Sequence, residues 1–335
     1  MKRVLVTGGL GFIGSNLVKR LVRDGYKVEV VDDLSNGTLD SIKELNVRSV
    51  PLALLSHYLK SQREECDVLC IHGDFADIQV LSRIAEKKYD VVFHLAAVPR
   101  VEYSVENPAI TTDINVMRTV SLMTACVQNV EKFVFSSSSA IYGNVENNYP
   151  SVESGNSAPT SPYGLQKEVI EKYCKLYFDL YDLDSVCLRY FNVYGPGQMG
   201  DSPYSTAVSA WMDKIKKSLP LRSDGDGEQT RDMVYVDDVV QANMLCALST
   251  NKLRGEIINV GTGNSISNKD ILDLLSKRFK FSVNKAPERK GDVKHTKANI
   301  SKAESLLGFK AETSFEDGLE KTINWWNLNE KQPEI

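Results

Sequence analysis

The sequence predicts an α/β protein in which a doubly wound parallel sheet is followed by a smaller α/β region. Three observations lead to this prediction. Apolar runs of strand length alternate with amphipathic runs of helix length through the first 190 residues. A glycine-rich turn separates the first strand from the first helix. Beyond residue 191 the elements become shorter, and the loops become richer in Gly and Pro.

The first predicted strand, residues 3–8 (RVLVTG), is apolar almost throughout, which is typical of a strand buried on both faces. An amphipathic helix is predicted at 13–23, and Gly25 ends it. Further strands are predicted at 27–33, 67–74, 90–97, 132–139 and 184–192. The helices between them are predicted at 77–88, 108–129 and 163–181. Strands that alternate with helices form parallel βαβ units, and the long segment 38–65 is expected to add one or two helices.

The turn "VTGGLGFIG" places Gly8, Gly11 and Gly14 between the first strand and the first helix. Glycines allow the backbone to turn tightly and to approach a pyrophosphate, whose charge is favourable at the amino end of a helix. The second strand ends at Asp32, where a carboxylate accepts from a ribose 2′-hydroxyl and repels a 2′-phosphate. The pattern therefore predicts a Rossmann dinucleotide site that prefers NAD to NADP.

These features divide the chain into two expected parts. Residues 1–190 would form the NAD-binding Rossmann domain, and 191–335 the substrate-binding region. Elements of 233–262 are expected to return to the first domain, and one more apolar strand is expected at 256–263.

Composition narrows the classes of partner. The net charge is −4, and no long basic run occurs, which argues against nucleic acid and anionic membranes as partners. No segment is long and apolar enough to span a bilayer, and no cleavage site follows a continuous apolar core, so we expect a cytoplasmic protein. His57, Cys66, Cys70 and His72 offer possible zinc ligands, but their spacing is unlike that of paired zinc knuckles. We predict no metal site.

A serine-rich stretch, "SSSSAIYG", follows an apolar run of the predicted strand. Its four consecutive serines end with Ser138 and Ser139. Alone, such a stretch is more typical of a loop than of a site. Tyr163 and Lys167 lie further along the chain, four residues apart on a predicted helix and hence on one face.

With these residues the chain resembles the extended short-chain dehydrogenase/reductase family, in its NAD-dependent epimerase/dehydratase branch. The resemblance covers nearly the whole chain and follows several motifs in order: "TGGLGFIG", "VVDDLSNG", "GDFAD", "HLAAV", "SSSSAIYG", "YGLQK", "RYFNVYGPGQ" and "RDMVYVDD". It implies that Ser138, Tyr163 and Lys167 act together in catalysis. A tyrosine is a poor base at neutral pH, but a neighbouring ammonium favours its phenolate.

The resemblance implies bound NAD and a set of contact residues for it. These are Gly8, Gly11, Phe12, Ile13, Gly14, Asp32, Asp33, Asn36, Gly37, Asp74, Phe75, Leu95, Ala96, Ala97, Asn115, Tyr163, Lys167 and Tyr190.

Within the family the chain is most similar to UDP-sugar 4-epimerases that act on UDP-N-acetylglucosamine and UDP-glucose. This implies a UDP-sugar substrate, which Ser138 and Tyr163 would contact at the reacting hydroxyl. Asn192 would contact the diphosphate-sugar, Arg231 and Arg289 the phosphates, and Asp292 the uridine ribose. Thr296 would border the C2 substituent, where a small side chain admits an N-acetyl group and its hydroxyl could meet that group.

Departures from related patterns narrow the reaction. Sugar-nucleotide dehydratases carry an Asp-Glu pair after the catalytic hydroxyl residue, where this chain has Ser139 and Ala140. Decarboxylases that make UDP-xylose carry Glu at the position of Ala140. Of the reactions considered, oxidation followed by re-reduction at C4 of the sugar remains.

Three alternatives stay open: a UDP-glucuronate 4-epimerase, a net sugar-nucleotide reductase, and a non-catalytic NAD-sensing regulator. Such regulators generally lack the Tyr-Lys pair. Family resemblance also implies a homodimer through helices near 108–129 and 163–181.

Overall fold

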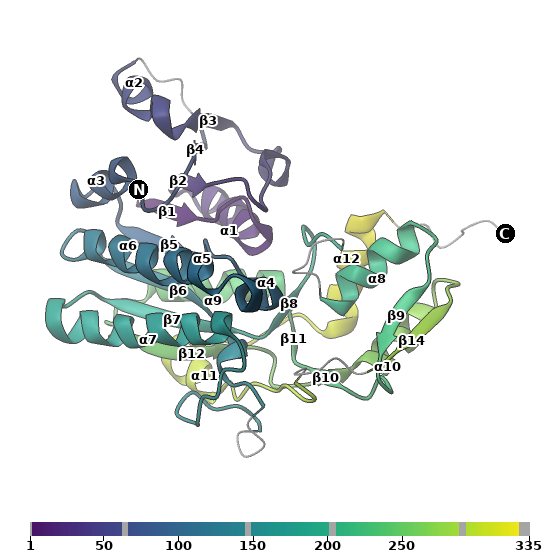
Figure 1. The fold of residues 1–335 in the computed structure, drawn as a ribbon. Coiled ribbons are helices and arrows are strands. Elements are labelled where there is room, and N and C mark those ends of the chain that lie inside the picture. The colour runs from purple at the N-terminus through teal and green to yellow at the C-terminus, as the bar shows by residue number, and fades with distance from the viewer. Residues whose placement is uncertain (1, 62–65, 145–148, 201–205, 288–292, 328–335) are drawn as a thin grey trace. The chain divides into compact units, whose positions relative to one another are not determined.

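The structure is a computed structural model that describes residues 2–61, 66–144, 149–200, 206–287 and 293–327 (Figure 1). The chain forms two compact units. The first comprises residues 1–138, 161–189 and 240–258, and the second 139–160, 190–239 and 259–335. The passage of 139–160 into the second unit has no counterpart in the sequence-based division at residue 190.

An eight-stranded sheet has the order β12-β7-β6-β5-β1-β2-β4-β3. Its strands are β1 (Arg3–Thr7), β2 (Lys27–Asp32), β3 (Val47–Pro51), β4 (Val68–His72), β5 (Val91–His94), β6 (Lys132–Ser138), β7 (Ser185–Tyr190) and β12 (Glu256–Val260). From β3 through to β6, each neighbouring pair of strands is parallel. The predicted doubly wound α/β fold is therefore confirmed.

The strands form where the sequence has continuous apolar runs. Val4, Leu5 and Val6 of β1 are all fully buried, as expected for a central strand covered on both faces. The helices and turns that follow the strands are α1 (Phe12–Arg23), η1 (Leu39–Ile42), η2 (Leu52–Leu54), α2 (Leu55–Lys60), α3 (Ile78–Ala85), α4 (Val101–Glu106), α5 (Pro108–Thr112), η3 (Asp113–Arg118), α6 (Thr119–Cys126), η4 (Ser139–Ile141), α7 (Pro162–Tyr181) and α9 (Val236–Leu248). Helices α6 and α7 pack side by side, and α7 contacts β6 (Figure 1).

Two segments differ from the sequence-based expectation. The segment 38–65 contains helix α2, as expected, and also strand β3, which pairs with β4 at the edge of the sheet. The single helix expected at 108–129 is divided into α5, the π-helical turn η3 and α6. π-Helical turns are frequent at functional sites, and η3 contains Asn115, a predicted cofactor residue.

The strand order places a switch point at β1. The chain runs from β1 to β2 and β4 on one side, then returns to β5 and β6 on the other. Ligands of doubly wound sheets bind outside the carboxyl ends of the strands at such a point. The sheet thus positions the ends of β1, β2, β4 and β5 around one location.

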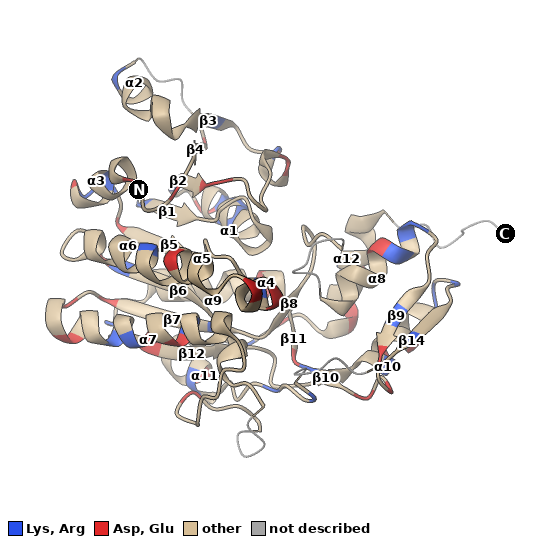
Figure 2. Cartoon of the chain, in the orientation of Figure 1, with Lys and Arg blue, Asp and Glu red and all other residues tan. Residues whose placement is uncertain are grey.

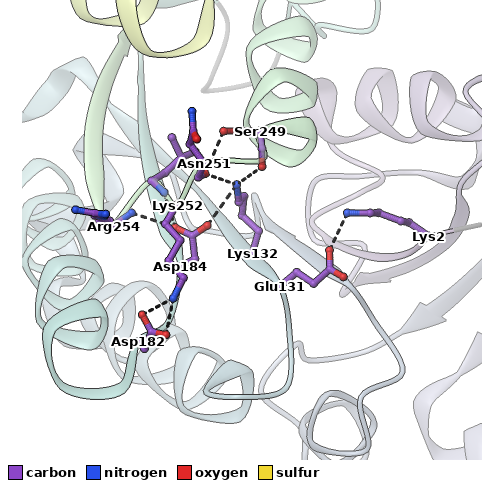
Figure 3. A network of polar contacts seen from close by, with 10 residues as sticks. Lys2, Glu131, Lys132, Asp182, Asp184, Ser249, Asn251, Lys252 and Arg254 are labelled. Carbon is purple, nitrogen blue, oxygen red and sulfur yellow. Dashed lines mark hydrogen bonds and ion pairs between the residues drawn. The ribbon is translucent and has the colours of Figure 1, made fainter.

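At the amino end of β6 a buried ion pair fixes neighbouring segments (Figure 3). Lys132 Nζ lies 3.3 Å from a carboxylate oxygen of Asp184 and donates to the carbonyls of Ser249 and Asn251 at 2.9 and 3.3 Å. The second Asp184 oxygen accepts from the backbone N–H groups of Leu253 and Arg254. The network ties the segment after α9 to the sheet.

The second unit consists of shorter elements. Its strands are β8 (Asn192–Tyr194), β9 (Leu221–Asp224), β10 (Thr230–Arg231), β11 (Met233–Tyr235), β13 (Ile266–Ser267) and β14 (Val283–Ala286). Its helices are α8 (Ala207–Lys216), α10 (Asn268–Ser276), α11 (Ser301–Leu307) and α12 (Phe315–Trp326). The strands of this unit pair as three two-stranded sheets: β8 with β11, β9 with β14, and β10 with β13.

Acidic and basic residues are interspersed along the helices of both units (Figure 2). Within the described ranges, no helix has the length and apolar character needed to cross a membrane.

Candidate active site

The glycine turn after β1 has no room for side chains. Gly8 adopts a φ of +68°, and a Cβ there would lie 2.7 Å from the backbone nitrogen of Ala96, which follows β5. A Cβ on Gly14 would lie 2.1 Å from the carbonyl oxygen of Gly8. The absence of side chains at both positions allows α1 to begin directly against the turn, with Gly11 at its N-cap. The exposed N–H groups of such a helix start are suited to a pyrophosphate.

Asp32 connects the end of β2 to this turn. Its carboxylate accepts from the backbone N–H of Leu10 at 3.0 Å and from that of Leu34 at 2.9 Å. Burial raises the pKa of Asp32, and the two backbone hydrogen bonds oppose that rise. Gly37 packs against the same turn, because a Cβ on it would lie 2.7 Å from the backbone of Leu10.

Three other predicted cofactor residues near β2 and β4, namely Asp33, Asn36 and Asp74, are more exposed than Asp32. Asp33 bonds Ser35 locally, and Asn36 is exposed. Asp74, after β4, accepts from the guanidinium of Arg118 at 2.6 Å, and Arg118 also bonds Asp113. An ion pair at Asp74 is a feature that the sequence analysis did not foresee.

A buried histidine lies behind the ends of β1 and β5. His94 contacts the hydroxyls of Thr7 and Thr119 at 2.7 and 2.9 Å, and the ring of Phe75 lies edge-on to it. Burial lowers the pKa of His94 to about 3, so the ring is neutral. The Thr7 hydroxyl oxygen also accepts from the N–H of Ala96 at 3.2 Å. This network fixes the start of the segment that contains Leu95, Ala96 and Ala97.

Asn115 fixes the next part of that segment. Its side-chain amide exchanges hydrogen bonds with the N–H and carbonyl of Val98 at 2.8 and 3.1 Å. Its Nδ2 also donates to Gln166 on α7. The π-helical turn therefore orients a side chain that links the loop after β5 to the helix that bears Tyr163 and Lys167.

Tyr163 and Lys167 lie on the buried face of α7. Ser161 caps the helix by accepting from the N–H of Gly164, and Pro162 occupies the first turn. Tyr163 is 9% exposed and Lys167 4% exposed. The Lys167 ammonium lies 5.8 Å from the centre of the Tyr163 ring and 4.6 Å from that of Phe135.

Strand β6 supplies the opposite side of this arrangement. Lys167 Nζ donates to the carbonyl of Ser136 at 2.6 Å, and Ser138 ends the same strand two residues later. Burial lowers the pKa of Lys167 to about 8, although Glu171 on the next turn opposes the shift. An ammonium beside a phenol lowers the free energy of the phenolate, so these residues can support proton removal from a hydroxyl.

A second buried ion pair supports this helix and was not predicted. Arg189 on β7 binds both carboxylate oxygens of Glu171, at 2.9 and 2.6 Å, and Ser137 donates to the same carboxylate at 2.6 Å. Glu171 continues the Tyr163–Lys167 spacing by four residues, which is a signal that the sequence offered.

In the second unit the structure describes three of the predicted substrate residues. Asn192 begins β8 and is half-buried. Arg231 donates to the carbonyls of Thr230 and Lys294. The Thr296 hydroxyl accepts from the N–H of Asp232 at 3.2 Å and donates to the Asn192 side-chain oxygen at 3.4 Å. Arg289 and Asp292 lie outside the described residues, and Tyr190 is buried at the end of β7.

Asp232 organises this region and was missed by the sequence analysis, although it stands within "RDMVYVDD". Its fully buried carboxylate accepts four hydrogen bonds, from the N–H and hydroxyl of Thr262 and from the N–H groups of Gly263 and Ala298. Burial raises the pKa of Asp232, whereas these donors lower it. The carboxylate joins three segments that are distant in sequence.

The side chains considered as zinc ligands do not gather. Cys70 is buried within β4, where burial raises the pKa of its thiol to about 12, whereas His72 at the end of that strand is exposed. Among the residues that the structure describes, no group of three His, Cys, Asp or Glu side chains could hold a metal ion.

The geometry of the first unit fits a dinucleotide. The glycine turn, in which a Cβ would clash with backbone, is suited to a pyrophosphate, and Asp32 ends β2 at the position where the sequence predicts a ribose contact. Tyr163 and Lys167 lie near the end of β6, two strands from β1 in the sheet.

Comparisons with known proteins agree with this geometry. Residues 4–261 match the family model described as "NAD dependent epimerase/dehydratase family". A UDP-glucose 4-epimerase of Mycolicibacterium smegmatis is 32% identical over 330 residues, which cover 97% of this chain and 98% of that protein.

Two solved structures are similar throughout. The UDP-N-acetylglucosamine 4-epimerase of Methanobrevibacter ruminantium, in complex with UDP-N-acetylmuramic acid, has a TM-score of 0.85 and 36% identity, covering 97% of this chain and 98% of that one. The UDP-glucose 4-epimerase of Thermotoga maritima with UDP-glucose has a TM-score of 0.86 and 33% identity, with the same coverage of each chain.

Proposed function

This chain belongs to the NAD-dependent epimerase/dehydratase family, and we propose that it inverts C4 of UDP-N-acetylglucosamine to give UDP-N-acetylgalactosamine, and the reverse. We propose UDP-glucose and UDP-galactose as a second pair. The observation that carries the proposal is the buried Tyr163–Lys167 face of α7 beside the end of β6.

The chain's own residues account for the movement of the proton. The Tyr163 phenolate oxygen removes the proton of the sugar C4 hydroxyl, and the Lys167 ammonium stabilises the phenolate. The Ser138 hydroxyl, at the end of β6, hydrogen-bonds the C4 oxygen and keeps it directed at Tyr163. When bound, NAD would be held by the glycine turn after β1 and by Asp32, and it would supply hydride transfer from C4 and back to the opposite face of C4 by way of a 4-keto sugar. Tyr163 then returns its proton to the C4 oxygen. Because the hydride also returns to C4, no external reductant is consumed.

Residues after Ser138 disfavour further chemistry. The turn η4 begins with Ser139 and Ala140, which carry no carboxyl group. Elimination of water across C5 and C6, or loss of a carboxylate, would need an acid or base that these side chains cannot supply. The 4-keto sugar is therefore expected to be re-reduced and released as the epimer.

Residues of the second unit support a UDP-sugar as substrate. Arg231 is proposed to bind the diphosphate, for which a guanidinium has suitable geometry. Asn192 is proposed to contact the diphosphate-sugar, and Thr296 to border the C2 substituent. Thr296 is small, so we propose that it leaves space for an N-acetyl group.

We also propose that the protein is a cytoplasmic homodimer. Apolar side chains are exposed on α7, at Leu165, Leu176 and Leu180, and on α5 and η3, which contact α7, at Ile110 and Met117. Several exposed apolar side chains on neighbouring helices favour an interface. All six cysteines are free, which supports a reducing compartment.

The test is turnover without added reductant. Purified protein is incubated separately with UDP-N-acetylglucosamine, UDP-glucose and UDP-glucuronate, and the products are separated by chromatography. We expect 4-epimers of the first two. Turnover of UDP-glucuronate alone would reassign the substrate, a requirement for NADH would indicate a reductase, and no turnover would support a non-catalytic NAD-binding protein.

A further inference from the structure

The hydroxyl of Thr296 lies between two groups with opposite hydrogen-bonding needs. Its oxygen accepts from the backbone N–H of Asp232 at 3.2 Å. Its proton is directed to the side-chain oxygen of Asn192, Oδ1, at 3.4 Å. In the described part of the chain this oxygen is the one acceptor for that proton.

We call the two hydrogen bonds of the Thr296 hydroxyl, from Asp232 N–H and to Asn192 Oδ1, the relay. The surrounding backbone fixes both ends of this relay. Asn192 N–H donates to the carbonyl of Asp232 at 3.0 Å, and Thr296 N–H donates to that of Thr230 at 3.1 Å. The Asp232 carboxylate accepts from the N–H of Ala298, two residues beyond Thr296, at 3.0 Å. Because Asp232 is fully buried and bonded on both carboxylate oxygens, the spacing between Thr296 and Asn192 is set before a ligand arrives.

A side-chain amide has one accepting end and one donating end, and its neighbours decide which end points where. A backbone N–H can only donate, so the Thr296 oxygen must accept from Asp232, and the Thr296 proton must go to an acceptor. If the Asn192 amide were reversed, its NH2 group would face the hydroxyl, and the Thr296 proton would lose its acceptor. The relay therefore selects one orientation of the amide. No group among the described residues accepts from Asn192 Nδ2.

We infer that Thr296 is a positioning residue that orients the Asn192 amide so that its Nδ2 donates to the diphosphate of the UDP-sugar. The inference rests on the proposed function, and it gives Thr296 a role that is independent of the C2 substituent. The hydroxyl acts on every UDP-sugar alike, whereas the size of the side chain acts on N-acetylated sugars alone.

Two variants separate the hydroxyl from the shape of the side chain. Thr296→Val keeps the shape and removes the relay, and Thr296→Ser keeps the hydroxyl. We measure UDP binding by calorimetry and turnover of UDP-N-acetylglucosamine and UDP-glucose. Thr296→Val should weaken UDP binding about fivefold and raise KM about fivefold for both sugars, with kcat within about twofold. Thr296→Ser should remain within about twofold of the parent in every parameter.

The Asn192→Ala background shows whether the effect passes through the amide. Thr296→Val should have no further effect on UDP binding when Asn192 is already Ala. A fivefold loss that persists in this background would overturn the inference, and so would a loss confined to the N-acetylated sugar. Equal UDP binding by Thr296→Val and the parent would do the same. Failure of the parent to turn over any UDP-sugar would instead contradict the proposed function, since UDP binding is measured without turnover.

Discussion

Two lysines near opposite ends of strand β6 are equally buried, at 4% exposure, and have different surroundings. Lys132 begins the strand and pairs with the Asp184 carboxylate, and two backbone carbonyls accept its remaining protons (Figure 3). Lys167 reaches the Ser136 carbonyl near the other end and lies against the rings of Phe135 and Tyr163. Within the described ranges, no carboxylate lies at ion-pair distance from Lys167.

The difference separates a structural charge from a reactive one. The charge of a buried ammonium with a carboxylate partner is compensated in the folded protein. Lys167 is desolvated without such a partner, and its pKa falls to about 8. The negative charge that compensates it would arise on Tyr163 during turnover. We therefore propose that the amino end of the strand stabilises the fold, whereas the carboxyl end is organised for chemistry at a cost in stability.

The largest expected effect is at the catalytic end. Tyr163→Phe keeps the ring and removes the proton acceptor, so kcat should fall by about 10²–10⁴. The melting temperature should change little, and NAD should still copurify, because the glycine turn and Asp32 are untouched. Steady-state assays and cofactor extraction measure both. Activity within tenfold of the parent would remove Tyr163 from the role of base.

The corresponding change at the amino end of β6, Lys132→Met, should lower the stability of the fold. Lys132→Met leaves the Asp184 carboxylate buried without its cation, which should lower the free energy of unfolding by about 3–5 kcal/mol. The kcat per folded molecule should be unchanged. Denaturant titration and active-site-normalised kinetics provide the two readouts. As a control, Lys132→Met combined with Asp184→Asn should recover much of the lost stability, because a neutral amide needs no cation and its oxygen still accepts from the N–H groups of Leu253 and Arg254. An unchanged unfolding free energy in the single variant would show that the pair is not structural.

Lys167→Met should have the opposite effect on stability. In the folded protein the pKa of Lys167 is about 8, below its unfolded value of 10.5, so the folded state binds fewer protons between these pH values. The contribution of Lys167 to the unfolding free energy therefore rises with pH through this window, and the cost of burying the charge is fully present below pH 8. Cofactor-free Lys167→Met should be more stable than the parent at pH 7 by about 2 kcal/mol, although inactive.

Denaturant titrations at pH 7 and pH 10 test this prediction. The stability advantage of Lys167→Met should narrow toward pH 10, where the parent has lost much of its buried charge. An advantage that is the same at both pH values would mean that the removed side chain, and not its charge, is responsible.

The smallest expected effect concerns substrate breadth in the second unit. Thr296→Tyr should reduce kcat/KM for the N-acetylated pair by at least about tenfold, which is about 1.4 kcal/mol, because the larger ring would occupy the space proposed for the acetamide. The plain hexose pair should lose only the factor of about five that removal of the threonine hydroxyl causes, so the loss for the N-acetylated pair should exceed it. Competition assays with both substrates measure the ratio directly, and equal losses on the two pairs would show that the size of residue 296 is not selective.

Regular elements were predictable because their signals are local. The apolar runs that form β1, β2, β4, β5, β6 and β7 identified the sheet, and the glycine turn identified the dinucleotide site. Edge strand β3 was not predicted, because an edge strand needs no continuous apolar run, and only Val50 of its residues is fully buried. The π-helical turn that divides 108–129 contains Asn115, whose contacts with Val98 and Gln166 no local pattern records.

The residues of the candidate site also fall into two groups, those that could be chosen from the sequence and those that only the structure reveals. Tyr163, Lys167 and Ser138 stand in motifs that resemble those of a known family, so these residues could be chosen in advance; their roles remain predictions. Asp232 and the Glu171–Arg189 pair could not be chosen, because their importance arises from partners that are distant in sequence. Buried polar networks become visible only when tertiary structure shows which donors surround a carboxylate.

The most direct test of the account is the fate of the hydrogen at C4. UDP-N-acetylglucosamine deuterated at C4 is incubated with the protein in ordinary water, without added NADH, and the UDP-N-acetylgalactosamine formed is examined by mass spectrometry and NMR. The account predicts that the product retains deuterium at C4, because the hydride that leaves one face of the sugar returns to the other face of the same carbon. Product that has lost the deuterium to solvent, or no product without a reductant, would contradict it.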